Sequence, residues 1–144
     1  MRTLRYILLI CLFFSCKKEE PISETPSIEF VEVSPRQVVA FQEKLVFTIA
    51  YTDGDGDLGE NDSDIKNLFL KDNRNDIVYE YRISQLAPLD ANIIIQGQLD
   101  IELEGTGITN NSQEQSATFD IYLQDRSGNL SNTVTSSSII ITSL

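Results

Sequence analysis

Six carboxylates lie within twelve residues of the segment "YTDGDGDLGENDSDI", which runs from Tyr51 to Ile65. No Lys or Arg occurs between Lys44 and Lys66 to balance them. Like charges repel, and salt screens them only over about 8 Å at physiological ionic strength. A bound cation would hold this segment together, whereas a plain turn built from Asp and Gly would leave its carboxylates in water. The clustering favours the cation.

Three of these acids have the spacing of ligands for a hard cation. Asp53, Asp55 and Asp57 occupy alternate positions, and Gly54 and Gly56 separate them. Glycine permits the tight and left-handed turns through which carboxylates on alternate residues converge. Calcium accepts about six to eight oxygens from a flexible loop, whereas magnesium keeps most of its waters and demands octahedral geometry. Calcium is therefore the expected ion.

The acidic segment is not an EF-hand, although Asp64 falls at the twelfth position counted from Asp53. An EF-hand requires Gly at its sixth position and a bidentate Glu at its twelfth. Here the sixth position is Leu58, and the flanking segments have the pattern of strands. We expect Leu58 to turn inward beneath the loop, and Asp64 remains a candidate fourth ligand.

The strands that position these acids are predicted by hydrophobic alternation from Ile28 onward. No long stretch has helical spacing, and we expect seven strands, at residues 27–34, 44–51, 67–72, 77–83, 93–104, 117–125 and 133–143. Seven short strands with regular turn signals are typical of an all-β antiparallel sandwich of the immunoglobulin-like or fibronectin III-like class. Gly97, inside the fifth strand, predicts a bulge or a switch between sheets.

A fifth candidate ligand, Asp125, comes from the distant segment "QDRSGNLSN". In a seven-stranded sandwich the loops after strands two, four and six lie at one end. Asp125 begins the sixth loop, and the fourth contains Asp90 and Asn92, so further oxygen ligands are available there. Asp125 has an alternative role as a brace of its own turn, because Asp and Asn side chains often bond nearby backbone groups.

Composition excludes most catalytic chemistry and nucleic-acid binding. The chain of 144 residues has no His and no Trp, and its two cysteines, Cys11 and Cys16, both precede the predicted domain. No nucleophile elbow, phosphate-binding loop or Ser-x-x-Lys pattern is present, so we expect no enzymatic activity. After Cys16 the chain has nine basic and twenty-two acidic residues, a net charge of −13. A nucleic-acid backbone would repel such a chain.

The first fifteen residues, "MRTLRYILLICLFFS", predict a signal peptide. Arg2 and Arg5 precede an apolar run from Tyr6 to Phe14, which is shorter than the roughly 20 residues needed to cross a bilayer. With the next residue, "LFFSC" resembles the lipobox of bacterial lipoproteins, although Phe13 stands where Leu is usual. This resemblance implies that Cys16 carries covalent lipid and anchors the mature chain in a membrane. An ordinary secretory signal is the alternative.

Residues 16–27 predict a flexible tether between this Cys and a domain at 28–144. Within it, Lys18, Glu19 and Glu20 resemble the signal by which some Gram-negative bacteria send lipoproteins to the outer face of the outer membrane. The alternative is a charged, flexible tether that carries no export signal. The resemblance implies a surface-exposed lipoprotein of the outer membrane.

Two longer segments, "FTIAYTDGDGDLG" and "YLQDRSGNLSN", resemble a group of surface lipoproteins with one immunoglobulin-like or cadherin-like β-domain behind a lipobox. The resemblance implies a fold and a location, and it carries no activity. Two functions remain open: a binding module whose calcium-rigidified loops contact a glycan or a protein, and an accessory subunit of a larger outer-membrane assembly. Exposed aromatic residues near the loops would favour the first, and an exposed edge strand or flat apolar patch the second.

Overall fold

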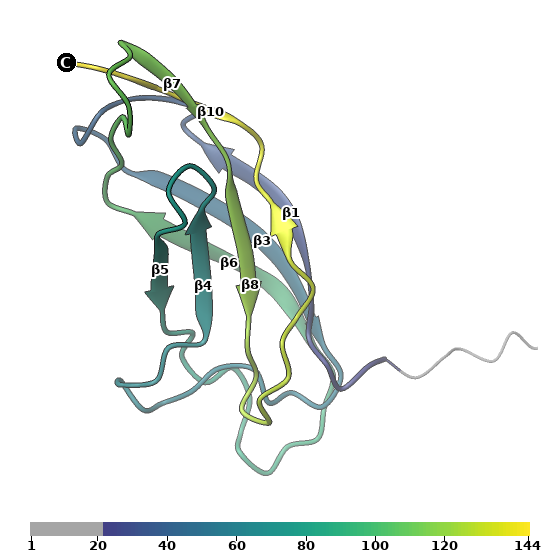
Figure 1. The fold of residues 1–144 in the computed structure, drawn as a ribbon. Helices are drawn as coiled ribbons and strands as arrows, with labels where there is room; N and C mark the ends of the chain where they lie inside the picture. Colours follow the sequence, from purple (N-terminus) through teal and green to yellow (C-terminus); the bar gives the residue numbers. More distant parts are fainter. Residues whose placement is uncertain (1–21) are drawn as a thin grey trace, which may run out of the picture.

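The computed structural model describes residues 22–144, and every regular element within them is a β-strand. The strands are β1 (Ser27–Ser34), β2 (Gln37–Val39), β3 (Leu45–Asp53), β4 (Leu68–Asp72), β5 (Val78–Tyr81), β6 (Ile95–Leu103), β7 (Glu114–Ala117), β8 (Phe119–Leu123), β9 (Val134–Thr135) and β10 (Ile139–Thr142). Figure 1 shows β4, β5 and β8 in front of β1, β3 and β6, in a sandwich-like arrangement of two layers.

The strands form three sheets, in the orders β1-β3-β6, β2-β10-β7 and β5-β4-β8-β9. All pairings between these strands are antiparallel except that of β2 with β10. The prediction of an all-β fold dominated by antiparallel pairing is confirmed. The expected number of seven strands is wrong, because the described residues contain ten.

The extra strands arise where the chain passes from one sheet to another. β7 pairs with β10, whereas β8, which starts two residues after β7 ends, pairs with β4 and β9. The segment expected as one strand at residues 133–143 is likewise divided into β9 and β10, which belong to different sheets. From β7 into β8 the alternation continues through buried Ala117 and Phe119, so the sequence pattern does not reveal that crossing.

The core lies between the layers and is built from the inward-facing residues of the strands. On β3, Leu45, Phe47 and Ile49 are fully buried, and the residues between them are half-buried. The ring of Phe47 meets that of Phe119 on β8 edge-on, with 5.1 Å between centroids. Each such side chain contributes about 1.5–3 kcal/mol by its burial, so the core fixes the register and direction of β3.

β6 runs beside β3 without interruption, with nine consecutive pairs from Asp53 opposite Ile95 to Leu45 opposite Leu103. The expected bulge at Gly97 is therefore absent from β6. The ring of Tyr51 covers Gly97 instead, and a Cβ there would lie 2.9 Å from the Tyr51 hydroxyl oxygen. The irregularity of this sheet lies in β1, between Phe30 and Glu32.

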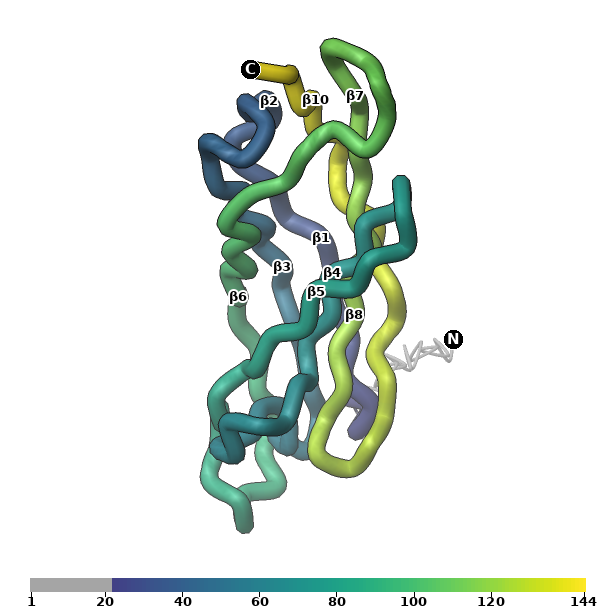
Figure 2. Tube along the Cα trace, turned by 60° about the vertical axis from the view of Figure 1, so that its left-hand side comes forward, coloured from purple at the N-terminus to yellow at the C-terminus, as the bar shows by residue number. Residues whose placement is uncertain are grey.

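Three loops meet at one end of the molecule, as the sandwich pattern predicts. They are residues 54–67 after β3, 82–94 after β5 and 124–133 after β8, and they lie at the lower end of the view in Figure 2. The backbone N–H of Ile93 donates to Asp55 O at 3.3 Å, and that of Arg126 donates to Asp57 O at 3.3 Å. This end of the molecule is called the acidic end below.

Candidate metal centre

The acidic loop begins with a carboxylate that β3 delivers into the interior. Asp53 is the last residue of β3 and lies on the same face as Phe47 and Ile49, so the alternation that buries the core also buries this side chain. It is 0% exposed. A buried carboxylate requires partners, because its transfer out of water is costly.

Two glycines allow the chain to turn directly after Asp53. Gly56 has a φ of 76°, in the left-handed region that side chains disfavour. At Gly54 a Cβ would lie 2.3 Å from the carbonyl oxygen of Ser23, so only glycine allows the two backbones to approach this closely. These turns bring Asp55 and Asp57 back toward Asp53.

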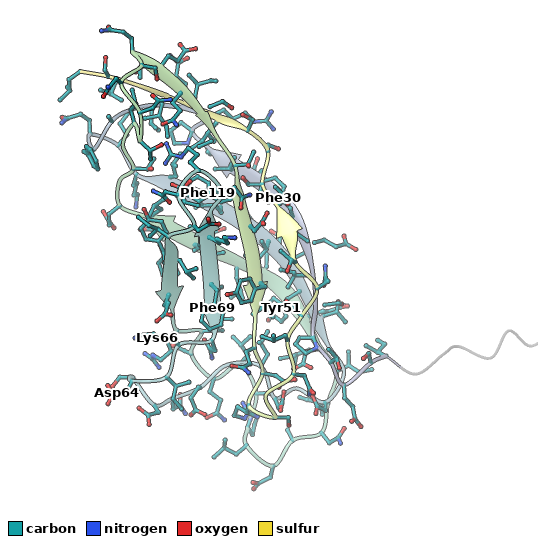
Figure 3. The ribbon with its side chains drawn as sticks, viewed as in Figure 1. Phe30, Tyr51, Asp64, Lys66, Phe69 and Phe119 are labelled. Atoms are coloured by element: carbon teal, nitrogen blue, oxygen red, sulfur yellow. The ribbon has the colours of Figure 1, made fainter. Side chains whose placement is uncertain are left out.

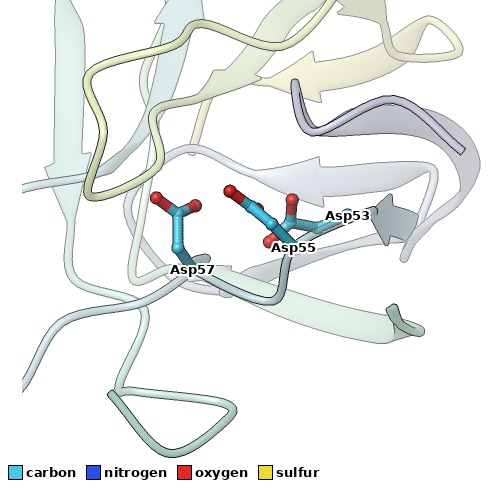
Figure 4. Close-up of side chains that lie close together, drawn as sticks. All are labelled: Asp53, Asp55 and Asp57. Carbon is cyan, nitrogen blue, oxygen red and sulfur yellow. The ribbon is translucent and has the colours of Figure 1, made fainter. Parts of the chain in front are cut away.

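The three carboxylates lie close together, as Figure 4 shows. One carboxylate oxygen from each of Asp53, Asp55 and Asp57 lies within 4.8 Å of the others. The Oδ1 atoms of all three are buried and have no hydrogen-bond partner. No other group of three His, Cys, Asp or Glu residues within 22–144 has this geometry. The structure brings these three of the five candidate ligands together.

Asp53 and Asp57 each use their second carboxylate oxygen, Oδ2, to accept hydrogen bonds from other parts of the protein. Asp53 Oδ2 accepts the backbone N–H of Leu58 at 2.9 Å. Asp57 Oδ2 accepts both the backbone N–H and the hydroxyl of Ser127, at 3.0 and 2.7 Å. Asp57 thus joins the acidic loop to the loop after β8, and the Oδ1 atoms of the three carboxylates are left without hydrogen-bond partners.

The electrostatics of the cluster disfavour three bare negative charges. Burial raises the pKa of Asp53 to about 6; the hydrogen bond from Leu58 opposes this rise, and the charges of Asp55 and Asp57 add to it. None of the salt bridges formed within residues 22–144 involves the cluster. The guanidinium of the neighbouring Arg126 donates to the carbonyl oxygens of Gly59 and Gly56 instead.

Leu58 forms the floor of the loop, as expected from its position between the acids. It is 0% exposed and belongs to the main hydrophobic core. Its N–H bonds to Asp53, and its carbonyl oxygen accepts the N–H of Leu86 at 3.4 Å. The apolar side chain therefore anchors the acidic loop to the core from below.

Two expected ligands lie outside the cluster. Asp64 is exposed, and its Oδ1 faces the hydroxyl of Ser63 at 3.4 Å; Figure 3 shows it on the outer side of its loop. Asp125 is buried, but its Oδ1 accepts the N–H of Asn129 at 2.7 Å and its Oδ2 accepts the Asn129 side-chain amide at 2.8 Å. The structure therefore places Asp125 as a turn brace and leaves Asp64 in solvent.

Ser127 is the residue of this site that the sequence did not indicate. Its hydroxyl and N–H reach Asp57 across a separation of 70 residues. A Ser next to Gly reads only as a turn former, so no signal in the sequence links it to the acidic loop. Asp90 and Asn92, also considered as oxygen donors, line a hollow beside Asp55 and Asp57 without entering the cluster.

The residues predicted for lipidation and export, Cys16, Lys18, Glu19 and Glu20, lie outside the described residues. Within 22–144 no helix is long and apolar enough to span a membrane.

Comparison of the chain with protein-family models, with curated proteins and with solved structures finds no match.

Proposed function

We propose that this protein is a lipid-anchored, non-catalytic module of the outer membrane whose β-domain is stabilised by a bound calcium ion. One observation carries the calcium part: one carboxylate oxygen from each of Asp53, Asp55 and Asp57 lies within 4.8 Å of the others around one point, and the Oδ1 atoms of all three are buried without hydrogen-bond partners. Leaving buried carboxylates unpaired costs several kcal/mol. A cation at that point offsets this cost and removes the mutual repulsion.

The donor set supports calcium over other metals. All three donors are carboxylate oxygens, which suit hard cations, and the described residues contain no His or Cys for a softer metal. Two of the three carboxylates stand in a loop rather than on a rigid strand. Calcium tolerates such flexible geometry, with waters completing its shell, better than magnesium does.

The burial of the Oδ1 atoms supports a structural role for the ion. All three Oδ1 atoms are shielded from solvent, so the ion would lie within the fold rather than on its surface. The second oxygens of Asp53 and Asp57 already hold two different parts of the fold. An ion between the three carboxylates would therefore bind the acidic loop to β3 and to the loop after β8.

Calorimetric titration of the purified protein tests the calcium proposal. Calcium should bind one site per chain and bind more tightly than magnesium. Asp55→Asn keeps the shape of a ligand and removes its charge, so it should weaken binding at least tenfold. Asp64→Asn makes the same change on an exposed acid of the same loop and should leave the affinity within about twofold. Absence of binding heat, or equal losses in both variants, would contradict the proposal.

The proposed location of the protein, in the outer membrane, rests on its N-terminal sequence. The lipobox-like "LFFSC" and the charged residues after Cys16 support a lipid anchor and display at the cell surface. β1 begins at Ser27, eleven positions after Cys16, so such an anchor would hold the start of β1 within about 40 Å of its membrane.

A second candidate function, an accessory subunit of a larger assembly, is favoured by the free edge of β6. Within residues 22–144 this nine-residue strand pairs only with β3. An apolar groove of about 530 Å³ lies beside it, lined in part by Leu68, Ile83, Leu86, Leu99 and Ile101. Unpaired edges and apolar surfaces are where further chains add.

Crosslinking in intact cells followed by affinity capture tests this candidate. Added lysines block edge pairing, so Gln96→Lys/Gln98→Lys should abolish a partner that docks on β6. The exposed pair Asn111→Lys/Gln113→Lys, in the segment before β7, a strand of another sheet, is the matched control and should retain that partner. Capture that is unaffected by the β6 substitutions would place the partner elsewhere.

A further inference from the structure

The chain enters the domain at the acidic end. β1 begins at Ser27, opposite Thr52, one residue before the end of β3. The preceding residues pass directly over the acidic loop, where the carbonyl oxygens of Ile22 and Ser23 lie 2.8 and 2.3 Å from the position of a Cβ on Gly54. The first described residues therefore lie against the acidic loop at Gly54, and Figure 1 shows the chain entering in the lower half of the sandwich.

The length of chain before this point limits how far the acidic end can lie from an anchor. Ile22 lies six positions after Cys16, and even a fully extended chain of six residues spans only about 20 Å. From there β1 runs toward the other end of the molecule for eight residues, or about 26 Å. A lipid on Cys16 would therefore hold the acidic end near the membrane, with the opposite end farther away.

The outermost segment at the acidic end exposes aliphatic side chains. Residues 82–94, between β5 and β6, form its tip (Figure 2). Within this segment Leu89 is 68% exposed, Ile94 54% and Ile93 49%. From residue 83 to 94 the only charged side chain is that of Asp90. Apolar side chains gathered on a loop tip are typical of surfaces that enter the boundary between headgroups and acyl chains.

From the point of chain entry, the reach of the tether and this apolar tip, we infer that the acidic end rests on the membrane, with Leu89, Ile93 and Ile94 in contact with lipid. The inference rests on the proposed anchor at Cys16. Calcium supports the arrangement, because the ion offsets part of the negative charge that the cluster carries beside this tip. The opposite end, which carries the exposed Phe41, faces away from the bilayer.

Tryptophan reporters test this orientation, because the chain has no Trp of its own. Leu89→Trp places one at the proposed lipid contact, and Phe41→Trp places a matched one at the opposite end, where the native side chain is 73% exposed. Each full-length lipidated variant is reconstituted with calcium into phosphatidylcholine vesicles, with or without brominated acyl chains. Flotation of the vesicles reports anchoring, and bromine quenching of Trp emission reports contact with acyl chains.

The expected result is that both variants float with the vesicles, while bromine quenches Leu89→Trp at least threefold more strongly than Phe41→Trp. Emission of Leu89→Trp should also shift to shorter wavelength on reconstitution. Flotation with equal or reversed quenching would overturn the orientation and leave the anchor intact. Failure of both variants to float would overturn the anchor proposal and this inference with it.

Discussion

Two of the three aspartates in the cluster use their two carboxylate oxygens in different ways. Asp53 and Asp57 use Oδ2 for hydrogen bonds within the protein, and their Oδ1 atoms are buried without partners. The Oδ1 atom of Asp55 is likewise buried without a partner, so all three residues have an oxygen free to bind an ion. The spacing of the three acids predicted their convergence, since alternate residues with glycine between them can turn toward one point.

The hydrogen bonds that Asp125 accepts give a prediction at the scale of a single residue. Its two oxygens accept the backbone N–H and the side-chain amide of Asn129, so Asp125→Ala should lower the free energy of unfolding by about 1–3 kcal/mol. Calcium affinity should stay unchanged in a calorimetric titration. Asn129→Ala removes the other partner and should reduce stability in the same direction. A marked loss of calcium affinity in Asp125→Ala would instead make this residue a ligand.

At the scale of elements, hydrophobic alternation predicted the longer strands, such as β3, β4 and β6. It did not predict the points where the chain passes from one sheet to another. β3, β4 and β6 were predicted to within about two residues at each end, because one face of each is packed or paired along its length. β2 was not predicted, since three residues give too short a pattern and its parallel partner β10 lies a hundred residues away. The crossing between β7 and β8 leaves the alternation intact.

Only part of the candidate site could be predicted from local sequence patterns. The loops after β3, β5 and β8 were expected at one end from sandwich topology alone, and they meet there. The contact of Ser127 with Asp57 and the passage of Ser23 over Gly54 depend on how loops far apart in the sequence pack. No local pattern encodes such contacts.

Leu58 gives the prediction at the scale of elements, because this side chain attaches the acidic loop to the core. Leu58→Ala removes a fully buried side chain and should lower the free energy of unfolding by about 2–5 kcal/mol. The matched control, Leu89→Ala, truncates an exposed leucine of the same end and should change the stability in solution by less than about 0.5 kcal/mol. Equal effects in chemical denaturation would show that Leu58 does not support the loop.

At the scale of the whole molecule, the two ends of the domain differ in their residues and in their distance from the N-terminal segment. The chain enters beside the cluster, so an anchored domain would turn its acidic end toward the bilayer. The sequence favoured loops of this end as the surface for a glycan or protein partner, but the exposed large apolar residues of the loop after β5 are aliphatic rather than aromatic. The edge of β6 is the better candidate for a partner, because it faces sideways from the sandwich.

Surface display gives the prediction at this scale. Replacement of Lys18, Glu19 and Glu20 by Ala should keep the protein in the membrane fraction and protect it from protease added to intact cells. Cys16→Ser is the companion variant, and it should release the protein from membranes altogether. Unchanged digestion of the triple variant would show that these three residues carry no export signal.

The central claim is that calcium holds the acidic end together, and thermal unfolding of the purified protein tests it most directly. An ion that binds only the folded state adds about 2.7 kcal/mol at a hundredfold excess over its Kd. At about 4 °C per kcal/mol for a domain of this size, removal of calcium by a chelator should lower Tm by about 10 °C. In Asp55→Asn, whose affinity should be at least tenfold lower, the shift should fall to about half or less at the same calcium concentration. Superimposable melting curves of the unsubstituted protein with calcium and with chelator would contradict the account.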